Sequence, residues 1–171
     1  MELTMDILTA RTWAGLTSLK IIDMVPATVL GTLRETPALV HCWASFWVVT
    51  APSTDTPVHV PHLQTLILEA EAIEGALVPL MERLEMPRLA RLAIKEELTG
   101  DIDADIVSHS LARLMRMWGC AKSLTTICFL DVSVEEPLRR AIQSATGVSE
   151  VLVSGYPVGE WHPPEEWGTY Y

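Results

Sequence analysis

Three aspartates alternate in the middle of the chain in a spacing that could bind calcium. Asp101, Asp103 and Asp105 form D-x-D-x-D, the arrangement of carboxylates that begins an EF-hand loop. Such a loop also needs a glycine at its sixth position and a glutamate at its twelfth, where this chain has Ile106 and Ala112. The calcium interpretation fails, and we interpret these acids as loop charges that favour the N-terminus of a following helix.

A second group combines two histidines with a carboxylate. His59 and His62 form H-x-x-H in a proline-rich segment that begins shortly after Asp55. Imidazole and carboxylate groups can bind metal ions or transfer protons, so an enzyme with a site built from loops is one alternative. The chain contains no G-x-S-x-G elbow, phosphate-binding loop or glycine-rich dinucleotide turn. We therefore expect no catalytic residue, no metal site and no cofactor.

The remaining reactive side chains do not form a recognisable set. Ser108, His109 and Ser110 are adjacent in a segment with helical periodicity, and adjacent helical residues do not face one another. The cysteines are odd in number and contain no C-x-x-C pair; they are Cys42, Cys120 and Cys128. This pattern favours reduced, buried thiols in a cytoplasmic or nuclear protein over a disulfide framework or a zinc site.

Length, charge and hydropathy narrow the function classes further. The chain has 171 residues, which predicts one domain covering 1–171, and about half of them are hydrophobic. The formal net charge of −10 would repel phosphate, so we expect no binding to nucleic acid. No apolar run reaches the roughly 18 residues of a membrane helix, so we expect no membrane partner.

One apolar pattern, L-x-x-L-x-L, recurs along the chain and predicts the strands that would position any site. Each occurrence has an apolar or small residue at its first, fourth and sixth positions. The six occurrences are residues 16–21, 39–44, 63–68, 89–94, 124–129 and 148–153. Their starts are separated by 23, 24, 26, 35 and 24 residues, and four of these spacings match leucine-rich repeats.

Residues between these patterns recur at helical spacing after the third, fourth and fifth occurrences. An earlier helix is predicted to begin near Pro26 and to end before Pro37. Pro79 interrupts the pattern that runs from Ile73 to Leu84, which predicts a kinked or divided helix. The alternation of strands and helices predicts parallel strands with crossover connections.

The predicted fold class is a leucine-rich-repeat-like α/β solenoid, with a parallel sheet on one face and helices on the other. The repeats cover about 16–155, and residues 156–171 form a tail or a cap. Positions four and six of each strand are expected to face the helices, and positions three, five and seven to face away. The second unit is irregular because 51–57 reads as a loop, and the fourth is longer by about ten residues, in its helix and in 96–103.

The chain resembles the leucine-rich-repeat region of F-box proteins. The resemblance rests on segments such as 16–21 and 61–68 and on a repeated P-x-L before the strand, at Pro37, Pro61 and Pro87. In that family the proline helps to end the preceding helix. The resemblance implies a protein-interaction scaffold that is the substrate-recognition part of an F-box ubiquitin ligase component. A Skp1-type adaptor would be bound only through an F-box, which this sequence lacks.

The sequence departs from many leucine-rich repeats at the position that usually carries asparagine or cysteine. That position lies three residues after the last strand leucine of each unit. Here it holds Met24, Trp47, Glu71, Glu97, Val132 and Tyr156. The loops are therefore expected to satisfy their backbone groups without a buried amide ladder.

We predict that a protein partner binds the open face of the sheet, opposite the helices. A mostly apolar column crosses this face through Lys20, Trp43, Ile67, Ala93, Cys128 and Leu152. Exposed apolar columns often mark partner surfaces, and the alternative is that the tail or a missing flanking region covers this one. The predicted contact residues are Lys20, His41, Trp43, Ile67, Glu69, Arg91, Lys95 and Leu152. A truncated or orphan repeat fragment without independent function is a further alternative to the scaffold.

Overall fold

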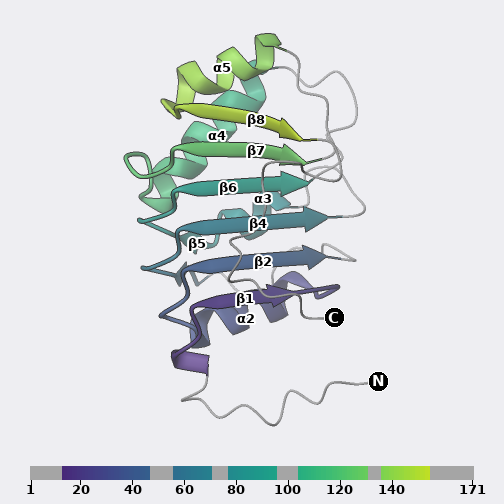
Figure 1. Cartoon of the computed structure of the whole chain (residues 1–171), viewed down its shortest axis with the longest axis vertical. Helices are drawn as coiled ribbons and strands as arrows, with labels where there is room; N and C mark the ends of the chain where they lie inside the picture. Colours follow the sequence, from purple (N-terminus) through teal and green to yellow (C-terminus); the bar gives the residue numbers. More distant parts are fainter. Residues whose placement is uncertain (1–12, 47–55, 71–76, 96–103, 131–135, 155–171) are drawn as a thin grey trace.

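The computed structural model describes residues 13–46, 56–70, 77–95, 104–130 and 136–154. Six parallel strands form one sheet, and their order in the sheet follows their order in the chain (Figure 1). The strands are β1 (Ser18–Ile21), β2 (His41–Phe46), β4 (Thr65–Ala70), β6 (Arg91–Lys95), β7 (Thr126–Leu130) and β8 (Glu150–Ser154). A strand therefore begins within each of the six L-x-x-L-x-L patterns, as predicted.

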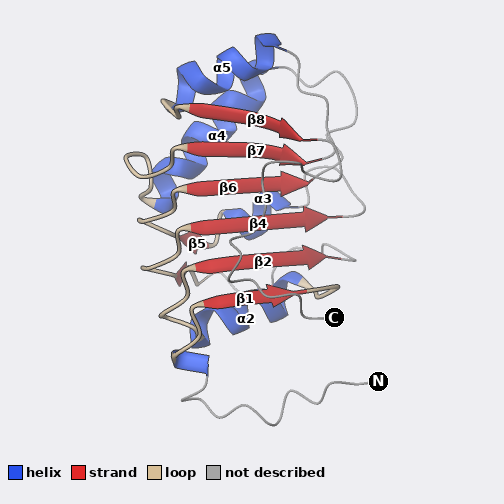
Figure 2. Cartoon of the chain, viewed as in Figure 1, coloured by secondary structure: helices blue, strands red, loops and turns tan. Residues whose placement is uncertain are grey.

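The described helices lie together on one face of this sheet (Figure 2). They are α2 (Pro26–Glu35), α3 (Leu77–Met81), α4 (Ala104–Trp118) and α5 (Glu136–Thr146). α2 begins at the predicted residue, Pro26. The ring of proline fixes a φ that suits a helix, and the first helical residue has no intrahelical acceptor for an N–H group, so the missing N–H costs nothing there. α4 is the longest of the four, with 15 residues, as the long fourth unit predicted. The prediction for 96–103 lies outside the described residues.

One feature of the third unit was predicted wrongly. Helix α3 is described over Leu77–Met81, with Ile73 outside the described residues, but Leu84, assigned by its spacing to the same helix, begins strand β5 (Leu84–Glu85). β5 pairs in parallel with β3 (Val58–His59) as a small second sheet. Pro79 lies inside α3, which continues past it to Met81, and the chain beyond α3 extends to pair with β3. The loop predicted at 51–57 is described only from Thr56, and His59 belongs to a strand.

The register of the main sheet places equivalent positions of successive units side by side. Ser18 pairs with His41, His41 with Thr65, and Thr65 with Arg91. The same row continues through Thr126 to Glu150. Each strand thus pairs with the next so that the same position of the L-x-x-L-x-L pattern lies opposite itself. Each unit therefore pairs only with its neighbours in the sheet.

The P-x-L motif forms a β-turn before the strand. The Leu39 N–H donates to the Thr36 carbonyl oxygen at 3.1 Å across Pro37, and proline at the second position of a turn has the φ that the turn requires. The equivalent bonds run from Leu63 to Val60 and from Leu89 to Met86. Before the second and third of these turns the chain is in β3 and β5 rather than in a helix. The expectation that these prolines end helices is therefore wrong for Pro61 and Pro87.

Backbone hydrogen bonds join successive units at the start of the strands. The Thr17 carbonyl oxygen accepts from the N–H groups of Val40 and His41 at 2.8 and 2.9 Å. The Val40 carbonyl oxygen accepts in the same way from Gln64 and Thr65 at 2.8 and 3.1 Å. The carbonyls of Gln64 and Ala90 each accept two N–H groups of the next unit. These shared carbonyls satisfy N–H groups at the start of the strands. Of the six positions that lack the usual asparagine or cysteine, only Met24 is described, so the expectation for the other five loops lies outside the described residues.

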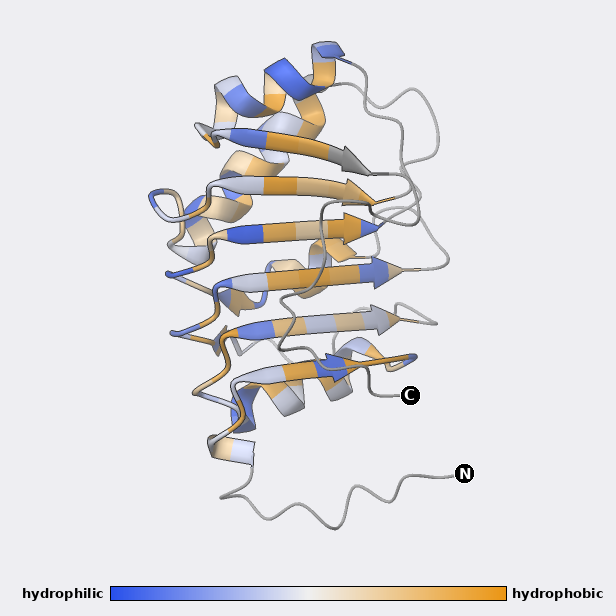
Figure 3. Ribbon diagram, in the orientation of Figure 1, coloured by the Kyte–Doolittle hydropathy of each residue, from blue (hydrophilic) through white to orange (hydrophobic). Residues whose placement is uncertain are grey.

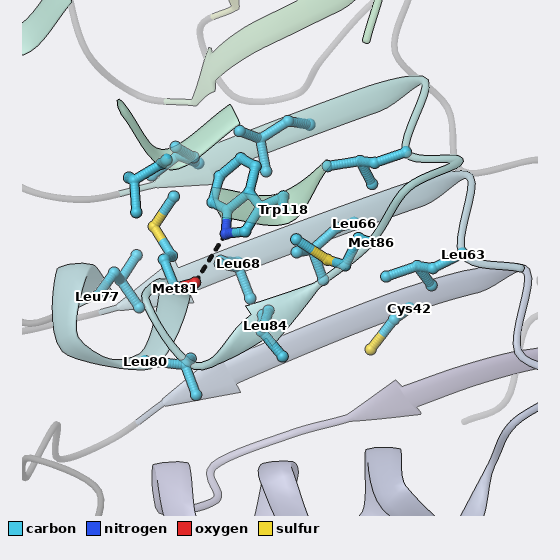
Figure 4. Close-up of a cluster of buried hydrophobic side chains, with 14 of the residues drawn as sticks. Cys42, Leu63, Leu66, Leu68, Leu77, Leu80, Met81, Leu84, Met86 and Trp118 are labelled. Carbon is cyan, nitrogen blue, oxygen red and sulfur yellow. Dashed lines mark hydrogen bonds between the residues drawn. The ribbon is translucent and has the colours of Figure 1, made fainter. Parts of the chain in front are cut away.

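The main core lies between the sheet and the helices, as the strand pattern predicted. Strand positions four and six belong to it, and the first leucines Leu39, Leu63 and Leu89 are fully buried. Figure 4 shows how α3, β5 and β4 enclose the indole of Trp118, which is 1% exposed. No helix in the described part of the chain is long and apolar enough to cross a bilayer.

Candidate functional site

The face of the main sheet opposite the helices carries most of the predicted contact residues, and we call it the second face. Because successive strand residues point to opposite sides of a sheet, it consists of positions three, five and seven of each unit. Its described strand residues are Ser18, Lys20, His41, Trp43, Ser45, Thr65, Ile67, Glu69, Arg91, Ala93, Lys95, Thr126, Cys128, Leu130, Glu150 and Leu152.

The apolar column predicted on this face is present as a continuous row. Lys20 pairs with Trp43, Trp43 with Ile67, and Ile67 with Ala93. Ala93 then pairs with Cys128, which is followed by Leu152. Six residues that are far apart in the sequence thus form one line across the sheet, because each occupies the fifth position of its own L-x-x-L-x-L pattern and those positions pair with one another.

This row forms the centre of a second hydrophobic cluster, separate from the main core. The cluster contains Ile67, Ala93, Cys128 and Leu130, and Trp43 and Leu152 pack against it. Strands β4, β6 and β7 are hydrophobic along most of their length (Figure 3). Near-continuous apolar runs are typical of parallel strands that are buried on both faces, and that is the environment of these three strands.

The centre of the second face is not exposed. This finding contradicts the expectation of an exposed apolar column. Ile67 is 3% exposed, Ala93 and Cys128 are 0% exposed, and Leu130 is 4% exposed. Burial raises the pKa of the Cys128 thiol to about 11, so it is neutral at physiological pH. Periodicity identifies which residues share this face but carries no information about what lies over it.

The margins of the second face are polar and more accessible. Lys20 and Arg91 are exposed, whereas His41, Glu69 and Lys95 are half-buried. Glu69 and Lys95 are register partners on β4 and β6, which places opposite charges side by side. The Thr126 hydroxyl donates to a Glu150 carboxylate oxygen at 3.3 Å at the other end of the face.

A cation–π contact joins the edge strand β1 to its neighbour β2 on this face. The Lys20 Nζ lies 3.6 Å from the centroid of the Trp43 ring, well within the range of this attraction. The lysine therefore covers part of an aromatic ring that is half-buried. A cation above an indole at the margin of an apolar cluster resembles the amphipathic anchors of protein interfaces.

The end of β1 is held against β2 by a side-chain hydrogen bond. The Asp23 N–H donates to Ser45 Oγ at 3.1 Å, and the Met24 N–H donates to the Ser45 carbonyl oxygen at 3.2 Å. Asp23 has a φ of 55°, a left-handed conformation that aspartate tolerates better than most residues. Ser45 therefore has a structural role at one corner of the second face. The sequence pattern did not indicate this role.

The histidines of the loop-built enzyme alternative belong to a different part of the molecule. His59 Nδ1 lies 3.4 Å from a Glu85 carboxylate oxygen, and the His59 side chain is 58% exposed. His62 Nδ1 lies 3.4 Å from the Arg88 guanidinium. Each histidine thus contacts a residue of the following unit, and Asp55 lies outside the described residues. Within the described ranges, no three histidine, cysteine or acidic side chains are grouped as metal ligands.

The other reactive groups are placed by the helices. Ser108 is 2% exposed inside α4, whereas His109 is exposed on its outer side, so the two side chains diverge as their spacing predicted. Asp101 and Asp103 lie outside the described residues. Cys42 and Cys120 are buried in the main core, as expected for reduced thiols.

Comparison with protein-family models, with curated protein sequences and with solved structures found no significant match to this chain.

Proposed function

We propose that this chain is a leucine-rich-repeat-like solenoid that binds a protein partner through the second face of its sheet. The observation that carries the proposal is the second hydrophobic cluster, which lies opposite the helices with a charged margin. A hydrophobic centre with a polar rim is the usual composition of a protein interface. Curved or flat repeat sheets commonly offer such extended surfaces.

Three features support the repeat interpretation. The strands follow one another in order across the sheet, equivalent positions pair in register, and the same β-turn precedes β2, β4 and β6. Each feature repeats with the period of the L-x-x-L-x-L pattern. This is what a chain built from stacked equivalent units requires.

The test compares charge reversals on the second face with reversals elsewhere. A partner is captured from cell extract with the tagged full chain, identified, and purified for affinity measurements. Lys20→Glu with Arg91→Glu changes two exposed cations of the second face. Arg116→Glu with Lys122→Glu changes two exposed cations away from it and makes the same change in net charge.

We expect the second-face variant to bind the purified partner about tenfold more weakly, because reversed rim charges repel an interface that they previously complemented. The control variant should bind with an affinity within about twofold of the wild type, because substitutions outside the energetically important contacts change binding little. Equal losses for both variants would contradict binding at the second face. Failure to recover any stable partner would contradict the scaffold proposal itself.

The more specific proposal is that the partner is a substrate for ubiquitin ligation. It is supported by the resemblance of the repeated P-x-L and L-x-x-L-x-L segments to F-box proteins. Fusion of an F-box segment to the full chain should increase ubiquitylation of the captured partner in the presence of a Skp1-type adaptor. The fusion that carries the second-face reversals is the control, and no increase with either fusion would reject the ligase assignment.

A further inference from the structure

The described turns that lead into the strands lie side by side along one edge of the main sheet (Figure 2). We call this edge the turn edge. Hydrogen bonds fix the turn before β7 against the turn before β6. The Ser123 hydroxyl donates to the Pro87 carbonyl oxygen at 3.0 Å, and the Thr125 hydroxyl donates to the Ala90 carbonyl oxygen at 3.1 Å. The two turns therefore form one continuous surface.

The turn edge carries a group of exposed cations, which we call the turn-edge patch. Two of them lie in the turns before β6 and β7, one begins β6, and one lies in the last turn of α4, where the helix reaches the same edge. In chain order they are Arg88, Arg91, Arg116 and Lys122. Arg88 Nη1 lies 3.4 Å from His62 Nδ1, so the patch extends toward the turn before β4.

The patch cations are not paired with acids in the described part of the chain. None of the four forms an ion pair with a carboxylate there. Two acids on neighbouring strands have other partners. Glu85 lies 3.4 Å from His59 Nδ1, and Glu150 accepts the hydrogen bond of the Thr126 hydroxyl at 3.3 Å. The patch is therefore a local concentration of positive charge.

This concentration is a matter of placement, because the chain as a whole is rich in acids. It contains 22 aspartates and glutamates against 12 lysines and arginines. On the helices, Arg113 pairs with Glu82, and Arg139 and Arg140 both pair with Glu136. Neighbouring cations that have no such partner repel one another, and an anionic ligand would relieve that repulsion.

We propose that the turn-edge patch binds an acidic segment of a protein. The inference goes beyond the proposed function, because the turn edge is a different surface from the second face and uses none of its apolar residues. Three of the four patch cations are arginines. The planar guanidinium group of arginine donates two parallel hydrogen bonds to one carboxylate, a geometry that lysine cannot match.

The spacing of the patch suits a short extended peptide. Neighbouring strands are about 4.8 Å apart, so the turns before β6 and β7 are separated by about one strand spacing. An extended peptide advances about 3.3 Å per residue, so carboxylates one or two residues apart can reach both turns. A run of glutamates or aspartates is therefore the expected ligand.

The net charge of the chain favours a peptide over a nucleic acid. A charge of −10 repels the closely spaced phosphates of a polynucleotide, which extend well beyond four local cations. A short acidic peptide places its few charges on the patch itself, where attraction to the cations outweighs the screened repulsion from more distant acids.

The test measures binding of fluorescein-labelled hexaglutamate to the full chain by fluorescence anisotropy, at about 0.05 M NaCl, where screening is weak. The turn-edge variant is Arg88→Gln with Lys122→Gln. The control is Arg113→Gln with Arg140→Gln, which removes two exposed helix cations and makes the same change in net charge. Arg91 is unchanged in both variants because it also borders the second face. Circular dichroism checks that both variants are folded.

We expect the turn-edge variant to bind hexaglutamate about fivefold more weakly than the wild type, because each exposed ion pair contributes modestly. The control should bind within about twofold of the wild type. The difference should vanish at about 0.5 M NaCl, where the Debye length is only about 4 Å. Equal losses in the two variants, or no binding to the wild type at low salt, would overturn the proposal.

A nucleic acid is tested in parallel with fluorescein-labelled oligothymidylate. Weaker binding of oligothymidylate than of hexaglutamate would support the assignment of an acidic peptide. Tighter binding of oligothymidylate that is lost in the turn-edge variant would make the patch a nucleic-acid site and would overturn that assignment.

Failure of this inference and failure of the proposed function are distinguishable. Hexaglutamate binding without any recovered partner would retain the turn edge and reject the scaffold. A partner that depends on the second face, together with no hexaglutamate binding, would retain the scaffold and reject the turn edge. If both proposals hold, the Arg116→Glu, Lys122→Glu variant loses hexaglutamate binding and keeps its affinity for the second-face partner.

Discussion

The indole N–H of Trp118 donates a 2.7 Å hydrogen bond to the carbonyl oxygen of Met81, joining the last residue of α4 to the last residue of α3 (Figure 4). Both residues are at least 98% buried. The bond satisfies the Met81 carbonyl at the C-terminal end of α3, where no later helical N–H is available to donate to it. It therefore couples the third and fourth units through their shared core.

Replacement of this tryptophan should destabilise the protein in two steps. Trp118→Phe keeps most of the apolar volume but leaves the Met81 carbonyl without its donor, so we expect a loss of about 1–3 kcal/mol. Trp118→Ala also leaves a cavity and should cost about 3–5 kcal/mol. Urea denaturation followed by circular dichroism measures both. Met117→Ala, one residue away and exposed, is the control, and equal stability of Trp118→Phe and Met117→Ala would contradict the assigned bond.

Two glycines should respond in opposite directions to the same substitution. Gly147 follows α5 with a φ of +74°, which an L-residue adopts with strain, so Gly147→Ala should lower stability by about 1–2 kcal/mol. Gly31 lies inside α2 with no atom within 4 Å of an added Cβ. Gly31→Ala should raise stability by about 0.5–1 kcal/mol. Thermal denaturation of both variants checks the signs, and a stabilised Gly147→Ala would refute the helix-ending role.

The contact between Lys20 and Trp43 should be measurable as a coupling energy. Lys20→Gln removes the cation, Trp43→Leu removes the ring, and the double variant completes a cycle. Because Lys20 is exposed, we expect a coupling of about 0.5–1 kcal/mol from equilibrium denaturation. A coupling close to zero would mean that the 3.6 Å approach does not stabilise the fold.

The buried thiol of Cys42 should make stability fall at alkaline pH. Burial raises its pKa from 9.0 to about 12, so the folded protein retains a proton that the unfolded chain releases. The neutral thiol therefore contributes its full stability below about pH 9 and loses it as pH rises toward 12, by up to roughly 1.4 kcal/mol per pH unit.

Cys42→Ala separates this effect from other alkaline titrations. The stability gap between wild type and Cys42→Ala should shrink between about pH 8 and about pH 10.5, because only the wild type carries this thiol. Urea midpoints across that range provide the measurement. A gap that is constant or grows with pH would contradict burial of the thiol in the folded state.

Much of the strand layer could be predicted because its signal is local and repeated. Leu63, Leu66 and Leu68 recur with fixed spacing in neighbouring units, and the same spacing aligns the second-face row from Lys20 to Leu152. The β3–β5 pair could not be predicted in this way. Leu80 and Leu84 fit a helical period, and only pairing with a distant segment extends the chain at Leu84.

The sequence predicted which residues share the second face but not what surrounds them. The register prediction that brings Trp43 beside Ile67 is confirmed, since a period of one unit leaves no other alignment. The burial of Ile67 and Cys128 could not follow from that period. Burial of a side chain depends on which atoms lie above it, and spacing within a strand contains no such information.

The sequence by itself determined the order of the strands and the two sets of side chains, because alternation along a strand is a property of the backbone. It also contained P-x-L as a repeated element before three strands, but not the β-turn that this element forms. The tertiary structure alone decided that these turns follow strands as well as helices, that Trp118 donates to Met81, and that the row through Ala93 is buried. Those outcomes depend on contacts between residues distant in the chain, whose free energies no local pattern encodes.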